Sequence, residues 1–183
     1  EYERGTGREL PYAPDAVRFM AFSFADNATE LGQDALAVAE RFFQETVGRP
    51  YERDVYKELA DILLRYTRPE EAIAVYRKLQ DDPRWVHEPD NPEHLMAIVR
   101  LYSTNFIVRD LEKSGAERLK LTERYSEGGA WWEANRNNPD ALATATGFME
   151  SSLLGVAQEY FVRAQESGDQ GDYGLAASKY REY

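Results

Sequence analysis

Cysteine is absent from the 183-residue sequence. The chain therefore has no disulfide framework, no thiolate ligand for a metal and no cysteine nucleophile, and both oxidising and reducing compartments stay possible. Positive charge is scarce: 22 Lys and Arg face 33 Asp and Glu, a net charge of −11 at pH 7. Nucleic acids and anionic membrane surfaces both attract Lys and Arg, so neither is expected as the main partner.

Long apolar runs and strand patterns are missing as well. No run reaches the roughly 20 apolar residues of a transmembrane helix, so we expect no direct membrane insertion by this segment. Alternating Val, Ile and Thr between hairpin turns do not occur. Hydrophobic residues still make up 43% of the chain, enough to fill a core.

The chain begins at Glu1 without a secretory leader and ends at Tyr183 within a predicted helix, and we expect a fragment of a larger protein.

Helical periodicity is the dominant pattern. Apolar residues recur on one side of a helical projection, and Pro, Gly and Asp mark the ends of each periodic stretch. A loop containing Pro83 and Pro89 interrupts the pattern near its middle. We predict an all-α fold. The predicted helices cover residues 15–25, 33–47, 54–66, 69–82, 92–103, 109–125, 130–136, 139–167 and 172–183.

The predicted helices form pairs, and one pair carries a specific order of residues. Its first helix carries an aromatic residue, then a Leu followed by a small residue, then a second aromatic residue. Its second helix carries a small residue and an aromatic residue, and a proline follows. These positions are Tyr56, Leu59, Ala60, Leu63, Tyr66, Ala72, Tyr76, Leu79 and Pro83. The pattern resembles the tetratricopeptide repeat (TPR) family, although Leu79 is larger than the usual small residue and Pro83 falls about one position early. The small residues would let antiparallel helices approach closely.

The resemblance implies an α-solenoid of about four antiparallel helix pairs, a TPR-like right-handed superhelix. We expect one helical repeat region over residues 1–183. Its units would be approximately 14–50, 53–83, 92–127 and 139–183, of which the second matches best. The alternative is an irregular helical bundle held by ordinary Leu, Ala and Tyr packing.

A narrower resemblance is carried by residues 124–143, RYSEGGAWWEANRNNPDALA, and the long predicted helix that follows. This segment is similar to part of large repeat proteins of the bacterial envelope, including proteins associated with adventurous gliding motility. The resemblance implies a periplasmic or outer-membrane-associated protein, with the cytoplasm left open. Trp131 and Trp132 would point about 100° apart on a helix, so we expect one inside and one partly exposed, as packing residues or as an interface anchor.

Motifs for catalysis or metal binding are not found. His87 and His94 match no zinc spacing, and we predict that both are surface residues. Asp169 and Asp172 lack the remaining acids of a calcium-binding loop. No phosphate-binding loop, nucleophile elbow or HExxH motif occurs. We therefore expect no enzymatic activity, no metal and no cofactor in this segment.

The sequence favours a function in binding a protein or peptide partner. In the TPR family, the first helices of the pairs line a concave groove. The family's groove positions fall here on Arg18, Phe22, Lys57, Asp61, Leu64, Arg65, Met96 and Arg100. Such a groove would bind an amphipathic helix or an extended peptide, its basic residues attracting carboxylates and its apolar residues anchoring the chain. The Lys–Asn pair with which some relatives hold a C-terminal carboxylate is not matched, because Asp61 follows Lys57 after one turn.

Two alternatives stay open. One is a structural spacer in a longer array, packed against neighbouring repeats of the full-length chain and able to self-associate through its Tyr-rich last helix. The other is a non-catalytic part of a larger enzyme or sensor. The sequence identifies neither the partner nor the pathway.

Overall fold

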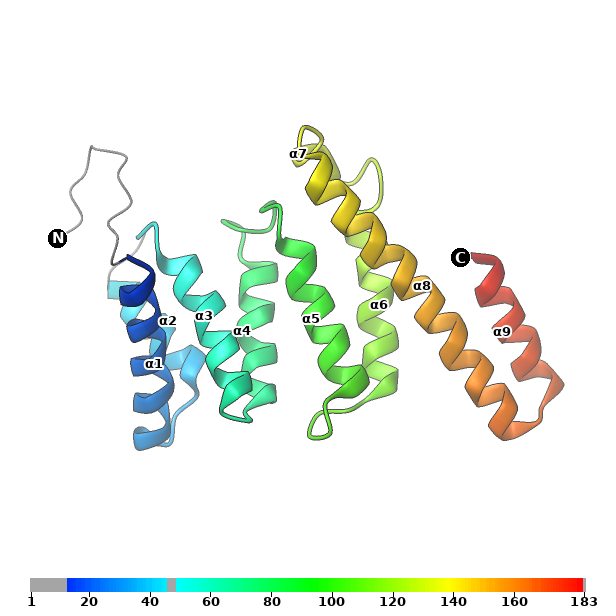
Figure 1. Ribbon diagram of the computed structural model, residues 1–183, viewed down its shortest axis with the longest axis horizontal. Helices are drawn as coiled ribbons and strands as arrows, with labels where there is room; N and C mark the ends of the chain where they lie inside the picture. Colours follow the sequence, from blue (N-terminus) through cyan, green and yellow to red (C-terminus); the bar gives the residue numbers. More distant parts are fainter. Residues whose placement is uncertain (1–12, 46–48, 183) are drawn as a thin grey trace. The chain divides into compact units, whose positions relative to one another are not determined.

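The computed structural model describes residues 13–45 and 49–182, and within these ranges the chain forms nine helices and no strand (Figure 1). The prediction of an all-α fold is confirmed. Within the described residues the predicted helix ranges agree closely with the structure, except that α1 continues well past Ala25. Residues 46, 47 and 183 of the predicted ranges lie outside the described residues. The helices are α1 (Ala13–Leu31), α2 (Ala35–Glu45), α3 (Glu52–Arg65), α4 (Pro69–Asp81), α5 (Asn91–Thr104), α6 (Leu111–Tyr125), α7 (Ala130–Ala134), α8 (Pro139–Ser167) and α9 (Gln170–Glu182).

The chain divides into two compact units, the first ending at Val75 and the second beginning at Tyr76. The division falls within α4, which is itself an uninterrupted helix. The single repeat region expected from the sequence therefore stays a prediction.

Small and aromatic side chains build the core of the first unit, where α1 packs against both α2 and α3. The ring centre of Phe43 on α2 lies 5.9 Å from that of Phe24 on α1 and 5.4 Å from that of Tyr56 on α3. Small residues allow the helix backbones to approach closely around these rings. The fully buried alanines of α1 and α2 are Ala21, Ala25, Ala28, Ala35 and Ala39.

Arg68 joins the ends of three helices of the first unit. Its Nε and Nη2 donate to the Glu71 carboxylate at 2.6 and 2.7 Å. Its Nη1 donates to the carbonyl oxygen of Ala25 at 3.1 Å and to the hydroxyl of Thr29 at 3.0 Å, both on α1. Glu71 also accepts the backbone N–H of Ala35, at the start of α2, at 3.0 Å. This half-buried ion pair thus fixes the ends of α1 and α2 against the start of α4.

In the second unit, a buried amide organises the connection between α4 and α5. Asn91, which is 1% exposed, donates from Nδ2 to the carbonyl oxygens of Leu79, Gln80 and Trp85 at 3.1 to 3.3 Å. Its Oδ1 accepts the hydroxyl hydrogen of Tyr125, the last residue of α6. Burial raises the pKa of Tyr125 to about 12, so its hydroxyl remains a donor at ordinary pH.

The short helix α7 holds the other side of the same connection. Trp131 donates from Nε1 to the carbonyl oxygen of Glu88 at 2.8 Å. Asn135 donates from Nδ2 to the carbonyl oxygens of His87 at 2.9 Å and Trp131 at 3.0 Å. The segment between prolines that the sequence predicts only as a loop is therefore held by the side chains of Asn91, Trp131 and Asn135.

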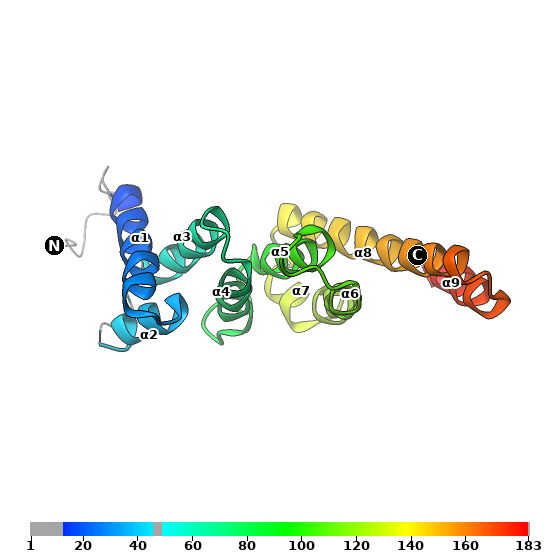
Figure 2. The same cartoon turned by 90° about the horizontal axis from the view of Figure 1, so that it is seen from below.

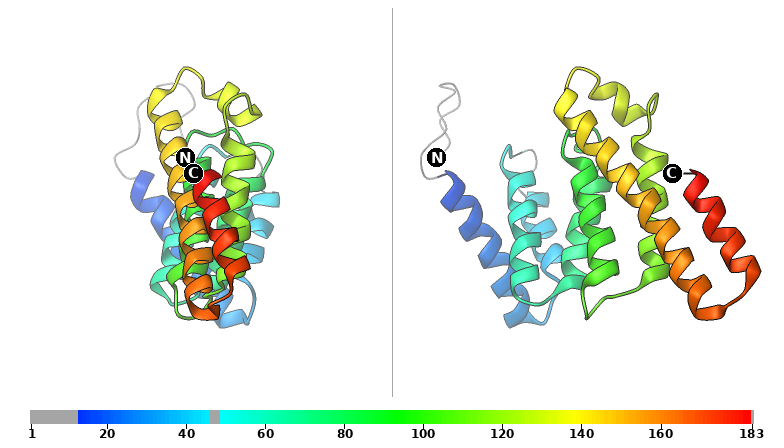
Figure 3. Two further views of the ribbon diagram at one scale, coloured as in Figure 1. Left: turned by 90° about the vertical axis from the view of Figure 1, so that its right-hand side faces the viewer. Right: turned by 45° about the vertical axis from the view of Figure 1, so that its right-hand side comes forward.

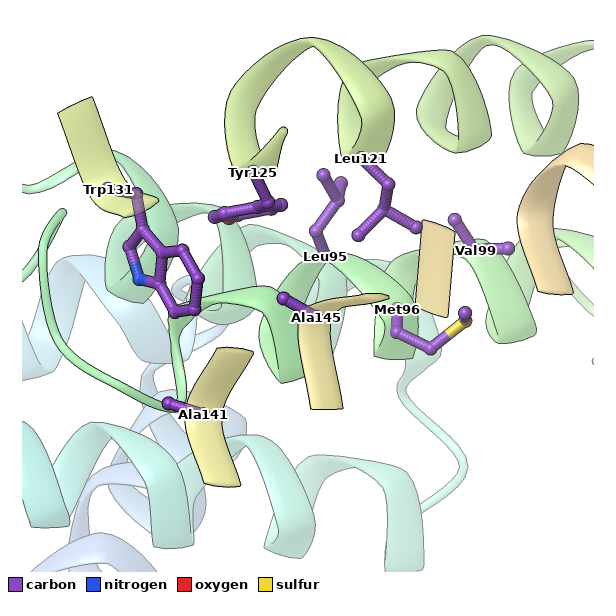
Figure 4. Close-up of a cluster of buried hydrophobic side chains, with 8 residues drawn as sticks. All are labelled: Leu95, Met96, Val99, Leu121, Tyr125, Trp131, Ala141 and Ala145. Carbon is purple, nitrogen blue, oxygen red and sulfur yellow. The ribbon is translucent and has the colours of Figure 1, made fainter. Parts of the chain in front are cut away.

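A hydrophobic cluster joins α5, α6, α7 and the start of α8 (Figure 4). The Trp131 ring packs edge-on against Tyr125, with centres 5.2 Å apart. Trp132 is half-buried against the same cluster, so one tryptophan lies inside and one is partly exposed, as predicted. The buried members are Leu95, Met96, Val99, Leu121, Tyr125, Trp131, Ala141 and Ala145.

Helices α6 and α8 contact each other in the second unit (Figure 2). Polar side chains lie between α6 and the middle of α8. Arg118 on α6 donates from Nη2 to the hydroxyl of Ser103 on α5 at 3.3 Å, and its Nε lies 3.6 Å from a carboxylate oxygen of Glu159 on α8. A Cβ at Gly155 would meet the Arg118 guanidinium at 2.4 Å, so the glycine makes room for this arginine. Desolvation raises the pKa of Glu159 despite the nearby Arg118.

Helices α8 and α9 run in opposite directions side by side (Figure 3). Gly168, with φ of +67°, ends α8 in the left-handed conformation that glycine adopts without strain, and its N–H bonds the carbonyl oxygen of Ala164 at 2.9 Å. Ala164 and Ala176 are buried, whereas several large apolar residues of this hairpin are exposed. These residues are Phe161, Val162, Tyr173, Leu175 and Tyr180.

We predict that Asn91→Ala lowers the free energy of unfolding by about 3 kcal/mol, because buried carbonyl groups and the Tyr125 hydroxyl lose their partner. Tyr125→Phe, which removes one of these hydrogen bonds, should cost about 1 kcal/mol. The measurement is urea unfolding followed by circular dichroism. Asn137→Ala, at an exposed position, is the matched control and should change stability by less than about 0.5 kcal/mol. Equal losses from Asn91→Ala and the control would contradict this account of the connection.

Acid should remove a second contribution to the stability of this connection. Hydrogen bonds from the Arg84 guanidinium, at 2.8 and 2.9 Å, lower the pKa of the buried Asp82 from 3.8 to about 2. Because the pKa is lowered in the folded state, the stabilisation is present above the unfolded pKa and is lost as pH falls towards about 2. Between about pH 5 and about pH 2, the free energy of unfolding of the native protein should fall by about 1 kcal/mol more than that of the Asp82→Asn variant. This value allows for solvent screening of the ion pair around the exposed Arg84. Parallel pH profiles for the two proteins would disprove the assignment.

Candidate partner-binding surface

Helices α1 and α3 place cationic, acidic and aromatic side chains next to one another in the first unit. Arg18 and Phe22 are one turn apart on α1, and Glu58 and Arg65 are two turns apart on α3, so each pair shares a helix face. Tyr66 follows directly after α3. Contact between α1 and α3 brings the two faces together. We call Arg18, Phe22, Glu58, Arg65 and Tyr66 the arginine–aromatic cluster.

One carboxylate oxygen lies between the two arginines of the cluster. Arg65 donates from Nη2 to Glu58 Oε1 at 2.9 Å, and Arg18 Nε lies 3.8 Å from the same oxygen. The guanidinium carbons of Arg18 and Arg65 are 5.5 and 6.0 Å from the centre of the Phe22 ring. The Tyr66 ring centre is 6.4 Å from that of Phe22. The cluster thus combines a shared carboxylate with an aromatic pair flanked by cations.

The cluster is accessible to solvent. The side chains of Arg18, Arg65 and Glu58 are 57%, 51% and 27% exposed, and Tyr66 is 44% exposed. The cluster itself contains two arginines and one glutamate, on a chain whose net charge is −11. Exposed ion pairs contribute about 0–1 kcal/mol to stability, so the fold depends little on these contacts. The arginines are therefore able to exchange their present partner for another anion.

The remaining predicted residues of the first unit lie along α3. Lys57 and Leu64 are half-buried, and Asp61 is exposed. Of the predicted residues in this unit, Arg18, Phe22 and Arg65 are brought together by described contacts.

Met96 and Arg100 belong to α5 in the second unit. Met96 is 5% exposed and lies in the hydrophobic cluster, so the expectation that it offers an apolar anchor to a partner requires correction. Its side chain is buried because α5 packs against both α6 and α8. Arg100 is exposed, and its guanidinium carbon lies 6.0 Å from the centre of the Phe148 ring on α8.

Sequence reasoning missed two members of the cluster. Glu58 is separated from Arg65 by seven residues, a spacing that returns to the same helix face and could have identified the pair. The sequence identifies Tyr66 only as an aromatic position of the TPR pattern. Its position after the last turn of α3 leaves it exposed beside Phe22.

Alternative kinds of site receive little support. Among the described residues, no group of three or more His, Asp and Glu side chains is placed to hold a metal ion. His94, predicted to be a surface residue, is 5% exposed on α5 and stacks on Tyr76, so that prediction is wrong, whereas His87 is exposed as expected. None of the helices within residues 13–45 and 49–182 combines the length and the apolar character needed to cross a membrane.

Comparisons of the chain with protein-family models, with curated proteins and with solved structures find no match.

We predict that the cluster contributes little to stability. Arg65→Ala should lower the free energy of unfolding by less than about 1 kcal/mol, because its ion pair with Glu58 is exposed. Tyr56→Ala, on the buried side of the same helix, should cost about 3–5 kcal/mol, since Tyr56 is 1% exposed and packs on Phe43. Chemical denaturation measures both. A loss for Arg65→Ala as large as that for Tyr56→Ala would show that the cluster is a structural element rather than an available surface.

Proposed function

We propose that this chain is a TPR-like helical-repeat scaffold that binds a partner polypeptide through the arginine–aromatic cluster. The observation that carries the proposal is the convergence of Arg18 and Phe22 with Arg65. Arg65 is far from Arg18 and Phe22 in the sequence, yet the three residues meet on an exposed face of the first unit. Arginine and aromatic residues are also the types that contribute most to protein interfaces.

The packing of the helices within each unit supports an α-solenoid. In the first unit, α1 contacts α3, and in the second unit α5 contacts α8. In both cases the first helix of one predicted pair packs against the first helix of the next predicted pair. This order is typical of stacked helix pairs, whose neighbouring repeats contact each other in sequence.

The proposed mechanism is binding to a preformed surface. The cluster is carried by regular helices, so its side chains need little backbone ordering when a partner arrives. The arginines would attract acidic groups of the partner, and Phe22 and Tyr66 would supply apolar contact. Because the surrounding ion pair is exposed, little folding energy is lost when the arginines change partner.

The proposal extends to a place in a bacterial cell-envelope or motility assembly, through the resemblance of residues 124–143. Periplasmic or outer-membrane-associated locations fit that resemblance, and the cytoplasm remains open. Within this segment, Tyr125, Trp131 and Asn135 hold the connection between α4 and α5. The resemblance therefore rests on residues that build the fold, and it supports an architecture more strongly than a particular partner.

A second candidate function is a spacer in a longer repeat array. The apolar residues exposed on the α8–α9 hairpin favour it, because packing against a neighbouring repeat would bury them. In that case the chain would self-associate through this hairpin, and changes in the arginine–aromatic cluster would not alter its associations. A role as the non-catalytic part of a larger enzyme or sensor has no specific support in the described residues.

The proposed function is tested by panning phage-displayed random peptides on the immobilised chain. Selected peptides are then measured by fluorescence polarisation against the native chain and the double variant Arg18→Glu/Arg65→Glu. We expect the double variant to weaken binding by about tenfold or more, which corresponds to about 1.4 kcal/mol. Arg136→Glu, an exposed arginine after α7, is the matched control and should change affinity by less than about twofold.

Two results would contradict the scaffold proposal. The first is a set of peptides that bind the native chain and the double variant equally well. The second is the absence of any selected peptide together with self-association of the chain in sedimentation equilibrium, which would favour the spacer.

A further inference from the structure

We propose that Glu58 occupies the place of a partner's carboxylate, and that the cluster recognises an acidic side chain next to an aromatic one. This inference rests on the proposed function and names the chemistry of the partner. Binding would exchange the Glu58 carboxylate for the partner's own, with the same two arginines as donors. Glu58 would thus act as a built-in competitor at the site.

Two guanidinium groups lie next to one carboxylate oxygen of Glu58. Its Oε1 accepts a hydrogen bond from Arg65 at 2.9 Å and lies 3.8 Å from Arg18 Nε, so both cations converge on one oxygen. A guanidinium has five N–H donors, and the described contact uses one of those of Arg65. An incoming carboxylate could therefore be held by two parallel hydrogen bonds, a geometry that arginine favours.

Exposure allows the exchange. The Glu58 side chain is 27% exposed and those of both arginines are more than half exposed. A partner's carboxylate can approach the guanidinium groups before Glu58 leaves, so no bare charge has to be buried on the way. The aromatic preference follows from Phe22 and Tyr66, whose rings lie beside the same arginines. Phe19, nearly one turn before Phe22 on α1, is 71% exposed and extends the apolar surface.

Charge favours a peptide carboxylate over a more highly charged anion. The cluster has two arginines and one acid, an excess of a single positive charge. The chain as a whole carries −11, which opposes the approach of nucleic acid or of densely phosphorylated segments. A single bound carboxylate brings the net charge of the cluster to zero, whereas an anion with two negative charges would leave it negative.

The test follows the arginine Nε–Hε signals of the complete chain by NMR during titration with a synthetic peptide. The probe is acetyl-Gly-Ser-Glu-Phe-Ser-Gly-amide, and its controls replace Glu by Gln or Phe by Ala. We expect the probe to shift the signals of Arg18 and Arg65, and each control peptide to bind several-fold more weakly. Glu58→Gln should bind the probe about two- to fivefold more tightly, the gain expected from removing an exposed competing ion pair. Glu30→Gln, at an exposed position of α1, should bind like the native chain.

Three results would overturn the inference: equal binding of the Glu and Gln peptides, no gain in affinity for Glu58→Gln, or tighter binding of inorganic phosphate than of the probe. These results are distinguishable from failure of the proposed function. If the panned peptides lose affinity for Arg18→Glu/Arg65→Glu but are indifferent to Glu58→Gln, the scaffold proposal stands and the exchange of Glu58 is wrong. If the panned peptides ignore the arginine reversals as well, both proposals fail.

Discussion

Polar groups that are buried between helices must find hydrogen-bond partners, and in each unit one side chain reaches several of them. Asn91 donates to three carbonyls around the connection between α4 and α5, and Arg68 donates to the carbonyl of Ala25 on α1. An unsatisfied buried polar group costs about 1–3 kcal/mol, a large part of the stability of a domain. These two residues therefore hold connections between helices against which the apolar cores are packed.

The packing residues of the first unit leave the outer faces of α1 and α3 available for the proposed binding. Phe43 and Tyr56 supply the packing of the first unit from the buried side of their helices, while Glu58 and Arg65 lie on a more exposed side. An ion pair at that exposure adds little to stability, so its residues are free to be chosen for recognition. Packing and the proposed binding thus involve different faces of the same helix.

The helices could be predicted from the sequence because their signals are local. Pro69 and Pro139 open helices, Gly168 ends one, and apolar spacing within a single stretch identifies the buried face. The long-range contacts could not be predicted in this way. The hydrogen bond from Tyr125 to Asn91 spans 34 residues, and the burial of Met96 depends on the later arrival of α6 and α8. The partnership of Arg18 with Glu58 likewise required the packing of α1 against α3, although the face shared by Glu58 and Arg65 was visible in their spacing.

The contacts made by residues 124–143 decide which properties the resemblance of this segment to other proteins can imply. In residues 124–143, Trp131 and Asn135 donate hydrogen bonds to the carbonyls of Glu88 and His87, respectively. The Trp131 ring lies in the hydrophobic cluster. A similar segment in another protein would have to preserve these side chains to preserve the fold, whatever that protein binds. The residues proposed to select a partner lie in the first unit, on exposed helix faces where substitution costs little stability. Sequence similarity in residues 124–143 therefore bears on architecture, while the proposed choice of partner depends on residues of the first unit.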